Sequence, residues 1–133
     1  MAQLQCIVVT PEKTLRDTPA EFVALTLFDG EIGIAPGHAP MIGRLGAGEM
    51  RITHANETVC YYIEGGFVEV LNNVVSVLTS RAIPAEALDE SVAMEQLETA
   101  RSRAANTPEL MAQRDQAINQ SRSLLRVARR ASR

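Results

Sequence analysis

Four side chains of this chain carry a thiol or an imidazole and could bind a soft metal ion: Cys6, His38, His54 and Cys60. Zinc sites that are recognisable in a sequence show paired ligands separated by about two to four residues. None of the four residues is paired at such a spacing. We therefore predict no metal site, and we interpret the two cysteines as small hydrophobic residues of strands in a reducing compartment.

The sequence also gives little indication of nucleophilic catalysis or of phosphate binding. Ser76, Ser80 and His38 are residue types that hydrolases use, but no nucleophile elbow surrounds either serine. Residues 43–48 read G-x-x-G-x-G, which is neither the Walker A motif nor the dinucleotide fingerprint, and no helical pattern follows. We assign no catalytic residue and no cofactor from these patterns.

The charge of the chain is unevenly distributed. The net charge is −3 at pH 7, yet five arginines and no acidic residue follow Asp115. These are Arg122, Arg126, Arg129, Arg130 and Arg133. A single lysine, few aromatic residues and an acidic whole argue against nucleic acid. We predict instead that the arginines face an acidic protein surface.

Residues 30–52 contain six glycines and two prolines between two strand-like runs. Glycine allows positive φ angles and proline fixes φ, so this composition specifies a folded loop rather than a flexible linker. The polar positions that this loop offers to a partner are Glu31, His38 and Arg44.

Two hydrophobic periodicities divide the chain. Up to about Thr79, β-branched residues alternate with polar ones, and turn residues recur every few positions. This pattern predicts about ten short strands in an antiparallel β-sandwich. No apolar run approaches the roughly 18 residues of a membrane span.

The pattern changes to a helical one after Pro84. Residues 86–104 lack proline and glycine and predict one helix, while Thr107 as N-cap and Pro108 at the first position predict a second helix to about Ala131. The expected apolar faces are Leu88, Val92, Leu97, Ala100 and Ala104 in the first helix, and Leu110, Met111, Ile118, Leu125 and Ala128 in the second.

The fold class is therefore α+β, with a β-sandwich domain over residues 1–84 and an antiparallel two-helix hairpin over residues 85–133. The apolar stripe of the hairpin is thin and rich in alanine. Because isolated helices of this size are marginally stable, we expect the docking of the hairpin on the sandwich to be weak enough to come undone.

Several motifs along the chain, taken together, are specific to one family. They are residues 33–40, Gly48 with Arg51 and Ile52, residues 65–70, residues 73–78, residues 88–95 and residues 125–128. In this order and over nearly the whole length, the chain resembles the ε subunit of F-type ATP synthases, which is called δ in mitochondria.

The resemblance implies a non-catalytic subunit of the central stalk, or rotor, of the proton-translocating synthase. In this family the β-sandwich contacts the γ subunit and the loops of the c-ring, and it couples their rotation to the catalytic head. The extended hairpin enters the α/β hexamer and inhibits ATP hydrolysis. The arginines from Arg122 to Arg133 would then contact acidic loops of the catalytic subunits.

The expected location is the cytoplasmic face of the bacterial inner membrane, where the chain would be held only through the complex. Residues 1–10 show neither a basic segment nor a cleavage signal and are interpreted as a first strand.

Some members of the family bind ATP on the hairpin through the motif I/L-D-x-x-R-A. Here Val92 occupies the arginine position of that motif, so the resemblance implies weak or absent ATP binding. Asp89, Arg122 and Arg126 remain the candidate ATP contacts, and Val92 is interpreted as a helix-packing residue. The alternatives left open are a free-standing nucleotide-sensing β-sandwich module and a β-sandwich enzyme or ligand-binding domain.

Overall fold

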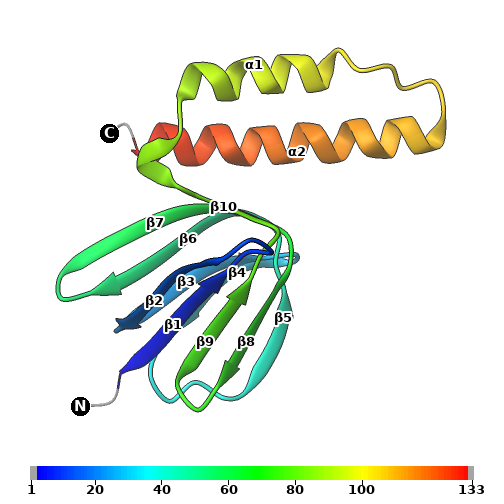
Figure 1. Cartoon of the computed structure of the whole chain (residues 1–133). Coiled ribbons are helices and arrows are strands. Elements are labelled where there is room, and N and C mark those ends of the chain that lie inside the picture. The colour runs from blue at the N-terminus through cyan, green and yellow to red at the C-terminus, as the bar shows by residue number, and fades with distance from the viewer. Residues whose placement is uncertain (1–2, 132–133) are drawn as a thin grey trace. The chain divides into compact units, whose positions relative to one another are not determined.

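The computed structural model describes residues 3–131. Its contacts divide the chain into two compact units, one ending at Pro84 and the other beginning at Ala85. The first unit is built of strands and the second of helices (Figure 1). The α+β class and the β-sandwich predicted from the sequence are thus confirmed.

The β unit contains ten strands in two five-stranded sheets. The strands are β1 (Leu4–Val9), β2 (Thr14–Ala20), β3 (Phe22–Leu27), β4 (Gly30–Ile34), β5 (Met41–Arg44), β6 (Ala47–His54), β7 (Glu57–Glu64), β8 (Phe67–Leu71), β9 (Val74–Leu78) and β10 (Arg81–Pro84). The first sheet has the order β2-β1-β9-β8-β5, and the second has the order β10-β7-β6-β3-β4.

One pair departs from the antiparallel pattern expected from the sequence. β1 lies parallel to β9, with Gln5 opposite Val74 and Val9 opposite Leu78. A long connection is needed to join parallel neighbours, and here all the strands from β2 to β8 lie between them. Local periodicity does not reveal such a non-local pairing.

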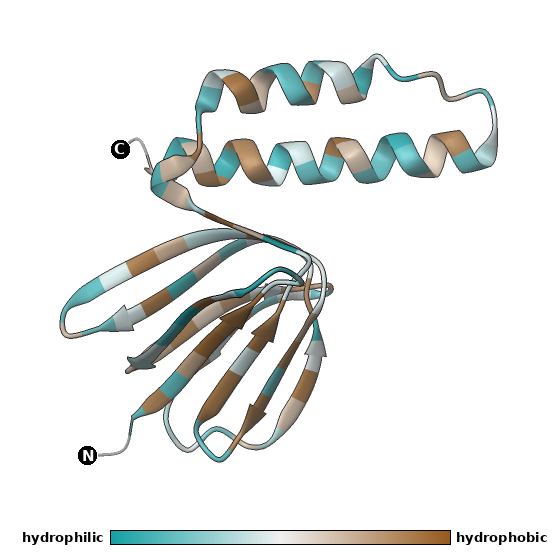
Figure 2. Cartoon of the chain, in the orientation of Figure 1, coloured by the Kyte–Doolittle hydropathy of each residue, from teal (hydrophilic) through white to brown (hydrophobic). Residues whose placement is uncertain are grey.

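Alternate residues of both sheets face inward and form one hydrophobic core. Fully buried members include Val8, Val23, Met50 and Ile63. The cluster is completed by Leu45, between β5 and β6, and by further strand residues: Leu4, Cys6, Ala20, Leu25, Ile34, Ile52, Tyr61, Val68, Val70, Val75 and Val77. Figure 2 shows the hydrophobic bands along β1, β8 and β9 that supply part of this core. The core gives the β unit its own source of stability.

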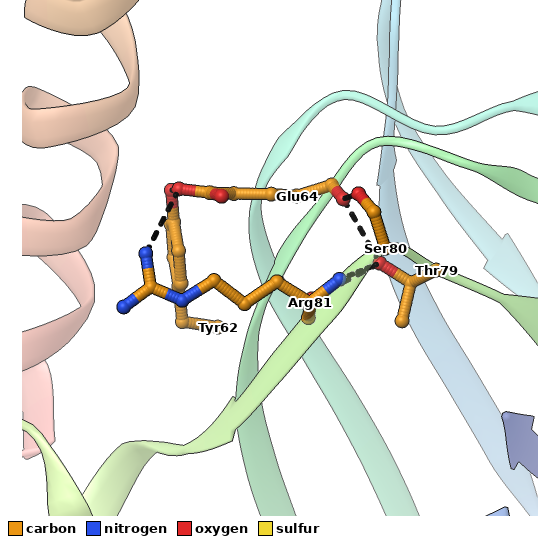
Figure 3. Close-up of polar contacts among 5 residues, drawn as sticks. All are labelled: Tyr62, Glu64, Thr79, Ser80 and Arg81. Atoms are coloured by element: carbon orange, nitrogen blue, oxygen red, sulfur yellow. Dashed lines mark hydrogen bonds and ion pairs between the residues drawn. The ribbon is translucent and has the colours of Figure 1, made fainter. Parts of the chain in front are cut away.

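A polar network joins the last strand of the β unit to β7 (Figure 3). The hydroxyl of Tyr62 donates to Glu64 Oε1 at 2.6 Å, and Arg81 Nη1 lies 3.6 Å from the same oxygen. Thr79 Oγ1 and Ser80 Oγ both donate to the backbone carbonyl of Glu64. Burial, and then the hydrogen bond to Glu64, raise the pKa of the Tyr62 phenol. The network fixes the point at which the chain leaves the sheet.

The helical unit consists of a short 3₁₀ turn over Ala85–Ala87, α1 (Glu90–Arg101) and α2 (Pro108–Ala131). The first helix is shorter than the predicted 86–104, because Asp89 adopts an extended conformation and caps its N-terminus. Thr107 caps α2 as predicted, since its Oγ1 accepts the N–H of Leu110 at 3.2 Å.

The buried faces of the two helices also differ from the prediction. The buried residues of α1 are Ala93, Leu97 and Ala100, whereas Val92 is 47% exposed. The interpretation of Val92 as a packing residue is therefore wrong, because the buried positions Ala93, Leu97 and Ala100 follow the spacing of one helix face, whereas Val92 lies five residues before Leu97 and falls outside it. Ala104 lies beyond α1 and is exposed.

The predicted face of α2 needs a similar correction. Leu110 and Met111 are exposed, and the buried positions lie in the second half of the helix: Ser121, Leu124, Leu125, Val127 and Ala128. α2 has 24 residues and α1 has 12, so part of α2 extends past the helix that pairs with it. Among residues 3–131, no helix combines the length and apolarity that a membrane span requires.

Candidate functional site

The second half of α2 carries a row of arginines along one face. Arg126 lies four residues after Arg122, and Arg129 and Arg130 lie three and four residues after Arg126, which are the spacings of neighbours on a helix surface. Together with Arg101 of α1 they line a groove of about 540 Å³, which we call the arginine groove. Leu97 and Leu125 form its apolar floor. Arg133 lies outside the described residues.

The sequence prediction did not include Arg101 among these residues. Arg101 could have been identified from its position four residues after the buried Leu97, because residues at this spacing are neighbours on one helix surface. Arg101 also pairs with Glu98, at 3.2 Å between Nη1 and Oε1. The groove concentrates five guanidinium groups and is suited to an anionic partner.

An ion pair links the two helices near the start of α1. Arg129 Nε donates to Glu90 Oε1 at 3.0 Å, and its Nη2 approaches the sulfur of Met94 at 3.9 Å. Both charged side chains are about half exposed. Such a pair contributes roughly 0–1 kcal/mol, so it favours the closed hairpin only slightly.

Asp89 performs a structural task at the N-terminus of α1. Its Oδ1 accepts the N–H of Ser91 at 2.9 Å, the hydroxyl of Ser91 at 2.7 Å and the N–H of Val92 at 3.5 Å. These hydrogen bonds, that of the Ser91 hydroxyl first, lower the pKa of Asp89. Neither Asp89 nor Val92 belongs to the described lining of the arginine groove. Asp89 therefore serves as a helix cap, and the arginines Arg122 and Arg126 that were named with it line the arginine groove.

The three polar residues predicted for partner contact do not form one cluster. Glu31 and Arg44 lie near the β3–β4 turn, where the N–H of Phe28 donates to the carbonyl of Arg44 at 2.8 Å. The guanidinium of Arg44 lies 4.7 Å from the centre of the Phe28 ring. His38 follows the other end of β4. Because a five-residue strand spans about 14 Å, His38 is separated from Glu31 and Arg44 by the length of this strand.

The loop that carries His38 is folded tightly. The N–H of His38 donates to the carbonyl of Ala35 at 3.2 Å, and Gly37 has φ +85°. His38 Nδ1 lies 2.8 Å from the carbonyl oxygen of Ala39 and donates its proton there. Because the ring is held through Nδ1, Nε2 is the nitrogen left for a partner.

The outer face of the first sheet is apolar, which the sequence analysis did not predict. Ile42, Phe67, Leu71 and Leu78 are 46 to 75% exposed. The register places Ile42 opposite Glu69 and Phe67 opposite Leu78, so these side chains lie on adjacent strands and on one face. We call this the apolar face. The sequence feature that indicates this face is the presence of apolar residues on both sides of β8 and β9. In a strand with one face exposed to solvent, apolar and polar residues normally alternate.

Two shallow grooves lie on this sheet. One, of about 390 Å³, is lined by Pro40, Met41, Ile42, Glu69, Val70 and Leu71. The other, of about 340 Å³, is lined by Val9, Thr10, Pro11, Leu78, Thr79 and Ser80. Exposed apolar surface of this kind marks a site of protein–protein contact more often than solvent-facing structure.

The thiol and imidazole groups considered for metal binding are dispersed. Cys6 is buried and Cys60 is half-buried, and both are free. Burial raises the pKa of Cys6 to about 12, and it also raises the pKa of Cys60. His54 lies at the end of β6 with its Nδ1 buried and without a hydrogen-bond partner. Within residues 3–131, no group of three or more His, Cys, Asp or Glu side chains is placed to hold a metal ion.

The fold agrees with a comparison against known proteins. Residues 3–85 match the family model of the ATP synthase delta/epsilon chain, beta-sandwich domain. The ATP synthase epsilon chain of Rhodopirellula baltica is 45% identical over 126 residues, which cover 95% of this chain and 98% of that protein. The sodium ion specific ATP synthase epsilon chain of Propionigenium modestum is 35% identical over 101 residues, 76% of this chain and 74% of that protein.

A solved structure shows the same fold. A chain in the cryo-EM structure of the Euglena gracilis mitochondrial ATP synthase, OSCP/F1/c-ring, superposes with a TM-score of 0.85 at 23% identity. The match covers 93% of this chain and 80% of that chain. The family model matches the β unit, and the Rhodopirellula relative extends the similarity over the helices. The chain therefore belongs to the ATP synthase delta/epsilon chain family.

Proposed function

We propose that the chain is a non-catalytic subunit of the central stalk of an F-type ATP synthase. The observation that carries this proposal is the 45% identity to an ATP synthase epsilon chain over both units. The apolar face supports it, because a stalk subunit must bury such a surface against its neighbours.

The γ subunit is the proposed partner of the apolar face. Ile42, Phe67 and Leu78 supply exposed apolar area, and Glu69 adds one carboxylate among them. The c-ring is the proposed partner of the polar loops, through Glu31 and Arg44 at one end and His38 at the other. Nucleic acid is not a proposed partner, and the chain would lie at the cytoplasmic face of the bacterial inner membrane, held through the complex.

The helical hairpin is the proposed inhibitor of ATP hydrolysis. The arginine groove gathers Arg122, Arg126, Arg129 and Arg130, and the proposed target is the set of acidic loops of the α and β catalytic subunits. Contacts between exposed charges weaken as ionic strength rises. Replacing these four arginines by alanine should therefore raise ATP hydrolysis, and the effect should shrink at high salt. An unchanged rate at low salt would contradict this role.

The arginine groove favours a second candidate, a nucleotide-sensing module. We expect weak or absent ATP binding, because Val92 supplies no positive charge and Asp89 is engaged as a helix cap. Arg122 and Arg126 alone remain from the expected set. Isothermal titration with ATP separates the two candidates, since micromolar affinity would support nucleotide sensing.

The stalk assignment is tested by reconstitution. The chain should join an F1 and c-ring assembly that lacks it and should restore ATP-driven ion pumping. Ile42→Asp should weaken this assembly at least tenfold, because a carboxylate would be buried without a partner. Thr58→Asp, at an exposed position of β7 in the other sheet, is the matched control and should assemble normally. Equal assembly of both variants would contradict contact through the apolar face.

A further inference from the structure

The turn between β8 and β9 consists of two asparagines. Asn72 has φ +50° and Asn73 has φ +64°, and Leu71 is paired with Val74 across the turn. Both central residues of a type I′ turn have positive φ, which asparagine and glycine adopt at low cost. The backbone of the turn would therefore accept glycine at either position.

The loop over residues 35–40 forms a second turn at the same end of the sandwich (Figure 1). Pro36 and Gly37 are its central residues, and the N–H of His38 closes it on the carbonyl of Ala35. Gly37, with φ +85°, takes the third position of a type II turn. The N–H of that residue is not used by the turn's own hydrogen bond and is available to another acceptor.

The side chain of Asn73 supplies that acceptor. The N–H of Gly37 donates to Asn73 Oδ1 at 2.8 Å, although 36 residues separate the two. The backbone carbonyl of Asn73 meanwhile accepts the N–H of Gln5 at 2.8 Å. Asn73 thus ties the His38 loop to the β8–β9 turn and to the first strand.

We propose that Asn73 is a positioning residue that holds the His38 loop in the conformation its partner binds. The proposal rests on the proposed function of this loop as a contact with the rest of the synthase. Without the Asn73 side chain, the loop would have to be ordered during binding, and affinity would fall accordingly. The side-chain oxygen of Asn73 is what serves this purpose, because the turn itself requires only positive φ.

The experiment compares three variants of the full chain. Asn73→Gly keeps the turn and removes the acceptor. Asn72→Gly is the matched control, since it makes the same change at the neighbouring turn position, whose exposed side chain has no hydrogen bond shown within residues 3–131. Asn73→Asp keeps an oxygen acceptor and should restore the contact. The two readouts are amide hydrogen exchange at Gly37 and affinity for an F1 and c-ring assembly that lacks this chain.

We expect Asn73→Gly to lose protection at Gly37 and to lower the affinity about 3- to 10-fold, the effect of one net hydrogen bond. Asn72→Gly and Asn73→Asp should resemble the parent chain in both readouts. Retained protection at Gly37, or an affinity equal to that of Asn72→Gly, would overturn the proposal. If the parent chain itself fails to bind the assembly, the proposed function fails with it, and Gly37 exchange then shows separately whether the hydrogen bond exists.

Discussion

Neighbouring glycines before β8 provide a sharp test of the β unit. A Cβ added at Gly66 would lie 1.9 Å from the carbonyl oxygen of Leu78, and 2.8 Å from the Cα of Thr79. At Gly65 the nearest atom is Ser80 Oγ at 3.4 Å, which is ordinary contact. Both glycines have positive φ, +98° at Gly66 and +65° at Gly65. Alanine therefore strains the backbone at both positions but clashes only at Gly66.

The two costs can be estimated separately. Positive φ costs an alanine about 1–2 kcal/mol, and the less flexible unfolded chain returns roughly 0.4–1 kcal/mol. Gly65→Ala should therefore lower the free energy of unfolding by about 1 kcal/mol. Gly66→Ala must also displace the end of β9, which disturbs the Phe67–Leu78 pair and the Leu45 N–H bond to Gly66. Each lost hydrogen bond adds about 1 kcal/mol, so the total should exceed about 3 kcal/mol.

Urea denaturation followed by tyrosine fluorescence measures the difference. The only tyrosines of the sequence are Tyr61 and Tyr62, and both lie on β7, so the signal reports the β unit. Gly66→Ala should unfold at a clearly lower urea concentration than Gly65→Ala, with a similar slope. Equal midpoints would refute the close packing of Gly66 against β9.

Three further predictions concern single side chains. The pKa of Asp89 is lowered in the folded chain, so its capping contribution is present above the unfolded value of about 3.9 and is lost as pH falls through the lowered value. Helicity measured by circular dichroism should therefore drop in acid, and Asp89→Asn should remove that drop. An identical acid transition in the parent chain and the variant would argue against the cap. Thiol labelling of the native chain should be slow at Cys60 and absent at Cys6, because burial raises both pKa values; rapid reaction of Cys6 before unfolding would be incompatible with a buried core position. Glu64→Gln should lower the free energy of unfolding by about 1–3 kcal/mol, since the Tyr62 hydroxyl loses a charged acceptor. A free energy of unfolding unchanged to within about 0.5 kcal/mol on the same urea assay would show that the network is dispensable.

The strands and the two-part organisation could be predicted because they depend on local patterns. Alternation at Val68 and Val70 marks the inward face of β8, and the Asn72–Asn73 pair marks a tight hairpin. Thr107 likewise marks the start of α2, because a cap acts on residues within one turn.

The remaining features depend on tertiary contacts, which local sequence patterns do not predict. The parallel pairing of β1 with β9 joins segments far apart in the chain. The face of α1 was misassigned at Val92, because the small Ala93 rather than the larger valine occupies the buried position four residues before Leu97.

The candidate surfaces were predicted unevenly. The arginines of α2 were found because their spacing is local, and Arg101 was missed because it comes from the other helix. The apolar face was missed because exposed Phe67 and Leu71 resemble core residues when only their type is considered. Their burial state is decided by which parity faces the second sheet.

The central claim is that the helical unit restrains ATP hydrolysis while the β unit joins the synthase on its own. The direct measurement is the ATP hydrolysis rate of the assembled enzyme, reconstituted either with the full chain or with residues 1–84. We expect both forms to assemble and hydrolysis to be faster with residues 1–84. Equal rates in two fully assembled enzymes would contradict it.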